Sequence, residues 1–151
     1  MTATTADDLR ANLIGAWLLH TYEARDIDGS ELVYPLGANA RGIIMYTPDG
    51  YMSAQLMRSD RKPLEGDDMQ PRANDDLAAA ANGYLSYAGP YSIVDDGLVA
   101  HHIDVSLLPN WIGGTQYRAA LLHDSVLELS PPEPILVGGK RLKPRLVWHR
   151  A

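Results

Sequence analysis

The sequence predicts a mainly β protein, an antiparallel up-and-down barrel of about eight strands with one helix. Three observations favour this fold. Alternating or apolar runs follow one another in hairpin succession, at residues 42–57, 91–107 and 115–130, with turn residues between them. Only residues 74–87 have a good helical pattern. The length of 151 residues suits one domain, 1–151, and no internal repeat divides it.

The hairpin at residues 42–57 organises the chain. Its turn is Thr47-Pro48-Asp49-Gly50, in which proline sets φ and glycine supplies a positive φ at the exit. A four-residue loop would place Tyr46 opposite Tyr51. One face would then be wholly apolar, with Ile43, Met45, Met52, Ala54 and Leu56, and the other mixed, with Ile44, Tyr46, Tyr51, Ser53 and Gln55.

Before this hairpin we expect a short helix and two strands. Residues 5–13 predict one or two helical turns, because Thr5 is a good N-cap and acidic residues follow it. Residues 13–23 and 31–35 predict strands. In the first of these strands the expected inward side chains are Trp17, Leu19 and Thr21, and the expected outward ones are His20 and Tyr22.

After the hairpin, residues 57–74 are charged and interrupted by proline and glycine, which predicts a long loop or lid over one end of the sheet. The helix at 74–87 follows, and Gly89-Pro90 should end the segment. The remaining predicted strands cover residues 91–94, 98–107, 115–123, 126–130 and 145–150.

Composition excludes several classes of function. A formal net charge of −6 argues against a nucleic-acid groove and a polybasic membrane patch. Cysteine is absent, which excludes thiolate catalysis and cysteine-ligated zinc. No apolar run is long enough to cross a membrane, and residues 1–8 do not resemble a signal peptide, so we expect a cytoplasmic protein. We expect no cofactor, since no dinucleotide or phosphate-binding motif is present.

The aromatic residues are unusual, because the chain has 8 Tyr and 3 Trp but no Phe. Every aromatic ring apart from histidine therefore carries a polar group. Such rings suit a cavity that is apolar yet offers hydrogen bonds. Compositional drift in an ordinary core is the alternative explanation.

A family resemblance follows from short motifs. Gly15-Ala16-Trp17, after a short helix and at the start of the first strand, looks like the G-x-W motif of lipocalins. In that family an arginine of the last strand lies over the tryptophan, a part that the resemblance gives to Arg150 or, less readily, to Arg145. The wider set of motifs comprises Tyr34-Pro35-Leu36-Gly37, Arg41-Gly42, Tyr46-Thr47-Pro48-Asp49-Gly50-Tyr51-Met52-Ser53-Ala54, Gly83-Tyr84, Tyr87-Ala88-Gly89, His101-His102 and Pro109-Asn110-Trp111.

Together these motifs cover nearly the whole chain and resemble the bacterial and fungal lipocalin-like domain family. The absence of cysteine is similar to its intracellular branch. The resemblance implies a barrel that binds a small apolar molecule. Some related small barrels catalyse isomerisation, cyclisation or lyase chemistry on such molecules, and fold alone does not decide between binding and catalysis.

His101 is the first candidate for chemistry. It shares a strand face with Val99, Ile103, Val105 and Leu107, so we expect a lone imidazole in an apolar lumen, suited to general acid or base work. A core histidine bonded to a tyrosine is the alternative. His102 and Asp104 occupy the other face, as a surface pair or, if the faces are reversed, as a dyad. Adjacent strand histidines point apart and cannot share a metal, and no metal site is predicted.

Further candidates depend on which strand faces line the lumen. Arg118 would anchor a carboxylate if it faces inward, although an exposed strand arginine is the alternative. Tyr117 lies on the same face of its predicted strand as the apolar residues, so it should face inward. Trp111 could cap the cavity mouth or cover the core. The candidate catalytic residues are His101 and Tyr51, and the candidate ligand-binding residues are Tyr46, Ser53, Gln55, Met57, Tyr87, Trp111, Tyr117 and Arg118.

Two functions remain open at this stage. The first is binding of a small hydrophobic molecule in the barrel, with neither nucleic acid nor membrane as a partner. The second is cofactor-free isomerase, cyclase or lyase chemistry on a small apolar metabolite, with His101 as general acid or base. A homodimer, with residues 131–134 as an interaction arm, is a third and weaker hypothesis.

Overall fold

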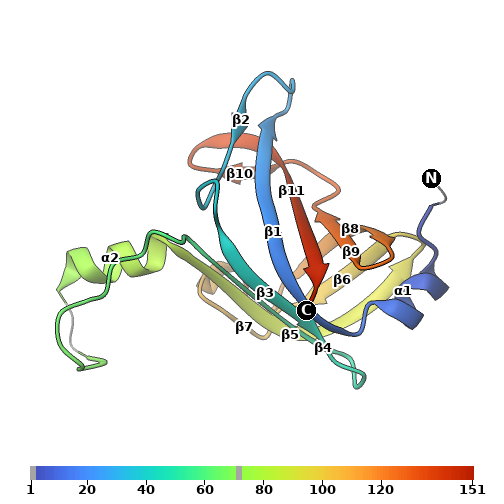
Figure 1. The fold of residues 1–151 in the computed structure, drawn as a ribbon, viewed down its shortest axis with the longest axis horizontal. Helices are drawn as coiled ribbons and strands as arrows, with labels where there is room; N and C mark the ends of the chain where they lie inside the picture. Colours follow the sequence, from blue (N-terminus) through green and yellow to red (C-terminus); the bar gives the residue numbers. More distant parts are fainter. Residues whose placement is uncertain (1–2, 71–72) are drawn as a thin grey trace.

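The computed structural model describes residues 3–70 and 73–151, and these form a closed antiparallel barrel with two helices (Figure 1). Each barrel strand pairs with the next along the chain, and the last pairs with the first, for example Trp148 with Leu19. The predicted up-and-down barrel is therefore confirmed. Its eight strands are β1 (Gly15–Asp26), β3 (Arg41–Tyr46), β4 (Tyr51–Met57), β5 (Tyr84–Asp95), β6 (Leu98–His102), β8 (Thr115–His123), β9 (Val126–Ser130) and β11 (Lys140–Arg150).

Short elements complete the fold at the rims of the barrel. The strands β2 (Leu32–Val33), β7 (Val105–Ser106) and β10 (Ile135–Val137) each pair with one barrel strand. One 3-10 turn, η1 (Pro109–Trp111), follows β7. The helices are α1 (Ala6–Asn12) and α2 (Asn74–Asn82). Residues 131–134 connect β9 to β10, so the segment predicted as a dimerisation arm is a rim connection; the homodimer itself stays a prediction.

The predicted register of the β3–β4 hairpin is wrong by one residue. Tyr46 pairs with Met52, and the turn closes where the Thr47 N–H donates to the Tyr51 carbonyl. The loop is therefore one residue shorter than predicted, and a shift of one residue exchanges the two faces of a strand. The buried face consists of Ile44, Tyr46, Met52, Ala54 and Leu56, and the outward face of Ile43, Met45, Tyr51, Ser53 and Gln55.

In the strand β1, the alternation of inward and outward side chains reverses part-way along. A bulge between Leu19 and Thr21 leaves His20 exposed, as predicted. Beyond the bulge the inward residues are Tyr22 and Ala24, both buried. The prediction that Thr21 faces in and Tyr22 faces out is therefore wrong, because the extra residue at the bulge reverses the alternation.

The prediction of a helix as far as Tyr87 is wrong as well. The helix α2 ends at Asn82, and from Tyr84 the chain forms the long strand β5, whose residues 84–90 pair with β4. Pro90 does not end this segment. Since the Tyr91 N–H donates to the Gly50 carbonyl on the β4 side, the nitrogen of Pro90 faces the opposite side, between β6 and β7, where no ladder bond is needed.

The strand predicted over residues 98–107 is divided into β6 and β7. Ile103 stays buried, but Val105 and Leu107 are exposed, contrary to the prediction that they face inward. At this break the His102 carbonyl approaches Gly89 so closely that a Cβ there would lie 1.9 Å from its oxygen. A glycine is required at position 89 for this close contact.

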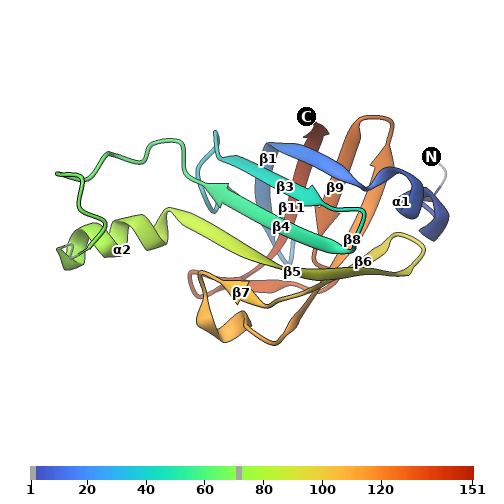
Figure 2. The same cartoon turned by 90° about the horizontal axis from the view of Figure 1, so that it is seen from below.

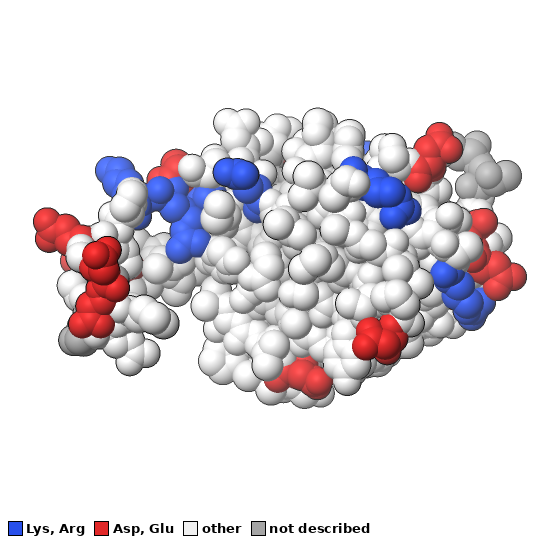
Figure 3. All heavy atoms as spheres, turned by 60° about the horizontal axis from the view of Figure 1, so that its bottom comes forward, with Lys and Arg blue, Asp and Glu red and all other residues white. Residues whose placement is uncertain are grey.

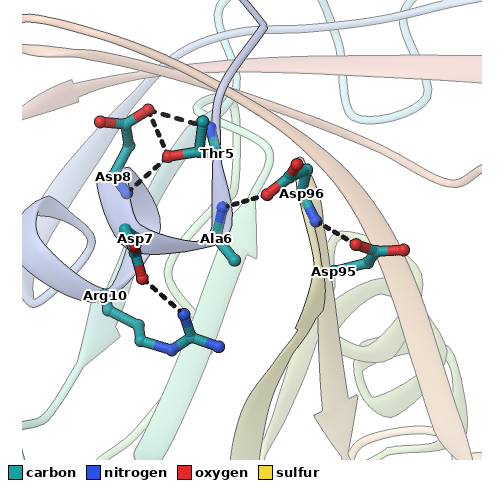
Figure 4. Close-up of polar contacts among 7 residues, drawn as sticks. All are labelled: Thr5, Ala6, Asp7, Asp8, Arg10, Asp95 and Asp96. Atoms are coloured by element: carbon teal, nitrogen blue, oxygen red, sulfur yellow. Dashed lines mark hydrogen bonds and ion pairs between the residues drawn. The ribbon is translucent and has the colours of Figure 1, made fainter.

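The helix α1 closes one end of the barrel. Thr5 and Asp8 form a capping box, and the Ala6 N–H donates to an Asp96 carboxylate oxygen at 2.7 Å, which ties the helix to the turn after β5 (Figure 4). Leu9 and Leu13 are completely buried in the same core as Trp17.

An arginine of the last strand covers Trp17, as the family resemblance implied. The Arg150 guanidinium lies 4.1 Å from the centroid of the Trp17 ring, a cation–π distance. It also donates to the carbonyls of Asn12 and Ile14, while the Trp17 indole N–H donates to Leu13 at 2.9 Å. Arg145 instead forms ion pairs with Glu23 and Glu128 on the outer surface.

Residues 58–70 and α2 form an arm that extends away from the barrel (Figures 1 and 2). The predicted lid over one end of the sheet is therefore not what the described part of this segment forms. The arm carries no buried side chain in α2, and only the end of that helix, at Ala81 and Asn82, reaches the barrel opening.

The face of the molecule in Figure 3 is largely uncharged between the arm and the α1 end. Exposed apolar side chains of β1 and β3 lie on the outer surface, among them Leu18, Ile43 and Met45. This surface contrasts with the acidic balance of the whole chain.

We predict that α1 contributes strongly to stability through its buried leucines. Leu9→Ala should lower the free energy of unfolding by about 2–5 kcal/mol, because a fully buried side chain is replaced by a cavity. Urea denaturation measures this change. The matched control Leu77→Ala lies on α2 with 49% of its side chain exposed, and should change stability by less than about 0.5 kcal/mol. Equal losses in the two variants would contradict the role of α1.

Candidate ligand-binding site

The barrel encloses a cavity of about 580 Å³, within the range usual for small-molecule sites. Strand residues such as Ile44, Ala54 and Leu129 form its inner wall. Its mouth is formed by rim segments: the loop after β2, the end of α2, η1 and β10. The side chains at the mouth are Pro35, Leu36, Leu108, Trp111, Ile135, Leu136 and Val137.

A second hollow, of about 690 Å³, lies on the outer surface of β1, β9 and β11. It is lined by charged side chains that pair with one another, including Arg145 with Glu23 and Glu128. An exposed groove of satisfied ion pairs offers little binding energy to an apolar ligand. The barrel cavity is therefore the better candidate site.

Three aromatic side chains form a hydrogen-bonded chain in the core. The Tyr46 hydroxyl lies 2.8 Å from His101 Nε2, and the Tyr87 hydroxyl lies 3.0 Å from His101 Nδ1. His101 is completely buried, and the two tyrosines come from β3 and β5. The inward position predicted for His101 agrees with this geometry, as does the alternative of a core histidine bonded to a tyrosine.

The neutral imidazole of His101 carries one proton on its two ring nitrogens, so it donates to one of the two tyrosines and accepts from the other. The Arg118 guanidinium lies near enough to the Tyr87 hydroxyl to oppose the rise in its pKa, through its charge and through a hydrogen bond. Since arginine has only donors, Tyr87 accepts that bond. Tyr87 therefore connects His101 to the charged residue of the cavity wall.

Burial sets the charge of this chain. It lowers the pKa of His101 to about 3, with smaller effects of the same sign from Arg118 and His102, so the imidazole is neutral near pH 7. Burial also raises the pKa of Tyr87, and raises that of Tyr46 well above its ordinary value. Neutral groups that bond one another avoid the cost of a buried charge.

His101 itself does not line the cavity wall, and both of its ring nitrogens are already bonded. Of the two tyrosines that hydrogen-bond His101, only Tyr87 also lines the cavity. A ligand would therefore meet the tyrosine hydroxyl rather than the imidazole. The role of His101 as a general acid or base stays a prediction.

Arg118 faces the cavity, the less expected of the two orientations that the sequence allowed. It lies opposite the buried Val99 in the β6–β8 ladder, and paired residues share a face. Its Nη1 donates to the Tyr117 carbonyl at 2.8 Å and to the Gln116 side chain at 3.3 Å. Across residues 3–70 and 73–151 no carboxylate forms an ion pair with it.

Two further donors in the cavity wall were missed by the sequence reasoning. Trp148 is 1% exposed, and its indole N–H has no hydrogen-bond partner in the structure. The Tyr22 hydroxyl has none within the described residues either, although its ring is buried. The bulge in β1 gave no signal for Tyr22, whereas the alternation of the last strand could have placed Trp148 inside.

Several predicted site residues lie outside the lumen. Tyr51 and Tyr117 are 52% and 49% exposed, so both face solvent. Ser53, Gln55 and Met57 alternate with the buried face of β4 and point outward, where the Tyr84 hydroxyl donates to Gln55 at 2.7 Å. The register shift in the hairpin, which reverses the faces of β4 relative to β3, explains all of these corrections except that of Tyr117.

Tyr117 faces out because β8 directs Arg118 and Ala120 inward instead. Trp111 is placed at the cavity mouth, with its ring edge-to-face against Tyr87 at 5.6 Å. His102 hydrogen-bonds Ser92 and Thr115 on the outer surface, and not Asp104, so no dyad forms there.

No group of three metal-ligating side chains gathers anywhere in the part of the chain that the structure describes. Neither described helix has the length and apolar character needed to span a membrane.

An eight-stranded barrel with one closed end, an apolar cavity and unpaired donors in its wall defines a small-ligand-binding protein of the lipocalin type. Comparison with known families agrees. Residues 14–151 match the model of the lipocalin-like domain, and the chain belongs to this family.

A curated protein of Aspergillus oryzae (strain ATCC 42149 / RIB 40) is similar over much of the chain. It is named 4'-hydroxy-3'-methoxypropiophenone carrier protein ppsC, and it is 33% identical over 106 residues, which are 66% of this chain and 96% of that protein. No solved structure matches the chain.

The buried imidazole predicts a pH dependence of stability. The pKa of His101 falls from 6.5 to about 3 on folding, so between these pH values the unfolded chain binds a proton that the folded chain does not. The free energy of unfolding should therefore fall as pH is lowered through this window, by about 2 kcal/mol from this group between pH 6.5 and 5. Urea denaturation at a series of pH values measures the slope.

His101→Gln should flatten that slope, because an amide can still bond both tyrosines but does not titrate. An unchanged slope in His101→Gln would show that other groups cause the acid sensitivity.

Proposed function

We propose that this protein binds and carries a small hydrophobic molecule that bears oxygen substituents, in the cavity of its barrel. The observation that carries this proposal is the combination of apolar walls with the unpaired Trp148 N–H and the cavity-facing Arg118. A buried donor without a partner costs free energy, which a ligand oxygen would recover. Apolar walls would bind the rest of the molecule by excluding water from its surface.

The similar carrier protein supports the same chemical class. The compound in its name, 4'-hydroxy-3'-methoxypropiophenone, has one aromatic ring, a ketone, a phenol and a methoxy group. Such a ring suits the leucine-rich wall and the Trp111 edge of the cavity, and its oxygens suit Arg118, Tyr87 and Trp148. We therefore propose small oxygenated aromatic compounds as the ligands.

Catalysis through His101 is the less supported alternative. A proton would have to pass through the Tyr87 hydroxyl, because neither ring nitrogen of His101 is available to a ligand. Burial lowers the pKa of His101 so far that protonation near pH 7 would be strongly unfavourable. Binding and transport need no such proton transfer.

Calorimetric titration with 4'-hydroxy-3'-methoxypropiophenone tests the proposal. The wild-type protein should bind one molecule, and Ala54→Met should weaken the affinity at least about tenfold, about 1.4 kcal/mol, because the new side chain occupies the cavity. Ala54 is buried in the cavity wall, so thermal unfolding should confirm that the variant remains folded.

The matched control is Ala119→Met, which introduces the same side chain on the outer face of β8. Its affinity should equal that of the wild type. Binding that survives in a folded Ala54→Met protein, or that Ala119→Met weakens equally, would place the ligand outside the barrel and overturn the proposal.

A further inference from the structure

Among the described side chains that line the cavity, none is a carboxylate. Arg118 is the one charged residue among the described side chains that line it. The Tyr22 hydroxyl and the Trp148 N–H have no hydrogen-bond partners within the described chain, and the Tyr87 hydroxyl also lines the cavity. The cavity therefore offers donors and a positive charge.

No neighbouring group supplies the opposite charge. The titratable groups that face Arg118 are Tyr22 on β1, Tyr46 on β3, Tyr87 on β5 and His101 on β6, and each is neutral near pH 7. Two of these groups, Tyr22 and Tyr87, line the same cavity as Arg118. Since a partly desolvated cation without a counter-ion is costly, the site favours a ligand that brings one.

We propose that the cavity takes its ligands as oxyanions, with Arg118 as the counter-ion. The inference rests on the proposed function and adds the charge state of the bound molecule. A phenol or another acidic oxygen at this position gives its proton to the solvent on binding, and the oxyanion accepts hydrogen bonds from Arg118 and the nearby donors. Charge-assisted bonds of this kind are stronger than neutral ones. A positive group a few ångströms away typically lowers the pKa of an acid by about 1–3 units.

The arrangement also explains why a tyrosine, rather than a carboxylate, lies beside the arginine. An aspartate or glutamate at this place would neutralise Arg118 and exclude an anionic ligand. The Tyr87 hydroxyl contributes a polar group without adding charge, because burial raises its pKa and keeps it neutral near pH 7.

A matched pair of ligands tests the inference. The first is 4'-hydroxy-3'-methoxypropiophenone, and the second is its O-methyl ether, 3',4'-dimethoxypropiophenone, which has no acidic proton. The wild-type protein should bind the phenol at least about tenfold more tightly than the ether at a pH one unit below the pKa of the free phenol. At that pH, adding protein should produce the red-shifted absorption band of the phenolate.

Variants of Arg118 identify the counter-ion. Arg118→Gln should abolish the phenolate band and bring the two affinities within about twofold of each other, whereas Arg118→Lys should keep much of the band because it keeps the charge. The control Arg25→Gln removes a positive charge from an exposed position of β1 and should behave as the wild type.

The outcomes separate this inference from the proposed function. If the wild type binds phenol and ether equally and no phenolate band appears, the barrel is a carrier of neutral molecules and the oxyanion inference is overturned. A band that persists in Arg118→Gln would equally overturn the role of Arg118. If neither compound binds, the proposed function fails, and the inference fails with it.

Discussion

The pairing of β11 with β1 is the constraint on which the rest of the structure depends. Once the sheet is closed, each strand residue faces either the lumen or the solvent, and neighbouring residues alternate between the two. Trp17 and Trp148 are both fully inside because their strands meet at this seam. The orientation of each candidate site residue on a barrel strand follows from its parity relative to this closure.

Inside the closed barrel, polar groups have to satisfy one another. Tyr46, His101 and Tyr87 do so as a neutral chain, which is stable in a medium of low polarity because none of the three carries a charge. The Trp148 N–H has no hydrogen-bond partner in the described protein, and no carboxylate of the described residues pairs with Arg118. The contrast separates groups that maintain the fold from groups that remain available for a ligand.

The general architecture could be predicted from the sequence, and most of the site could not. Turn residues and strand alternation suffice for an up-and-down barrel, and the Gly15-Ala16-Trp17 motif correctly implied that Arg150 covers Trp17. The orientation of the side chains is harder to predict. One residue in the hairpin turn places Tyr46 and Tyr51, which were predicted to share a face, on opposite faces, and one bulged residue brings Tyr22 inside. Arg118 could be placed inside only after its ladder partner Val99 was known.

The helix α1 and Arg150 close one end of the barrel, which leaves the other end as its opening. A ligand of the kind proposed above would therefore have to enter and leave through the same rim, around Trp111 and Leu136. Delivery would then depend on loosening the rim, rather than on competition for the buried arginine.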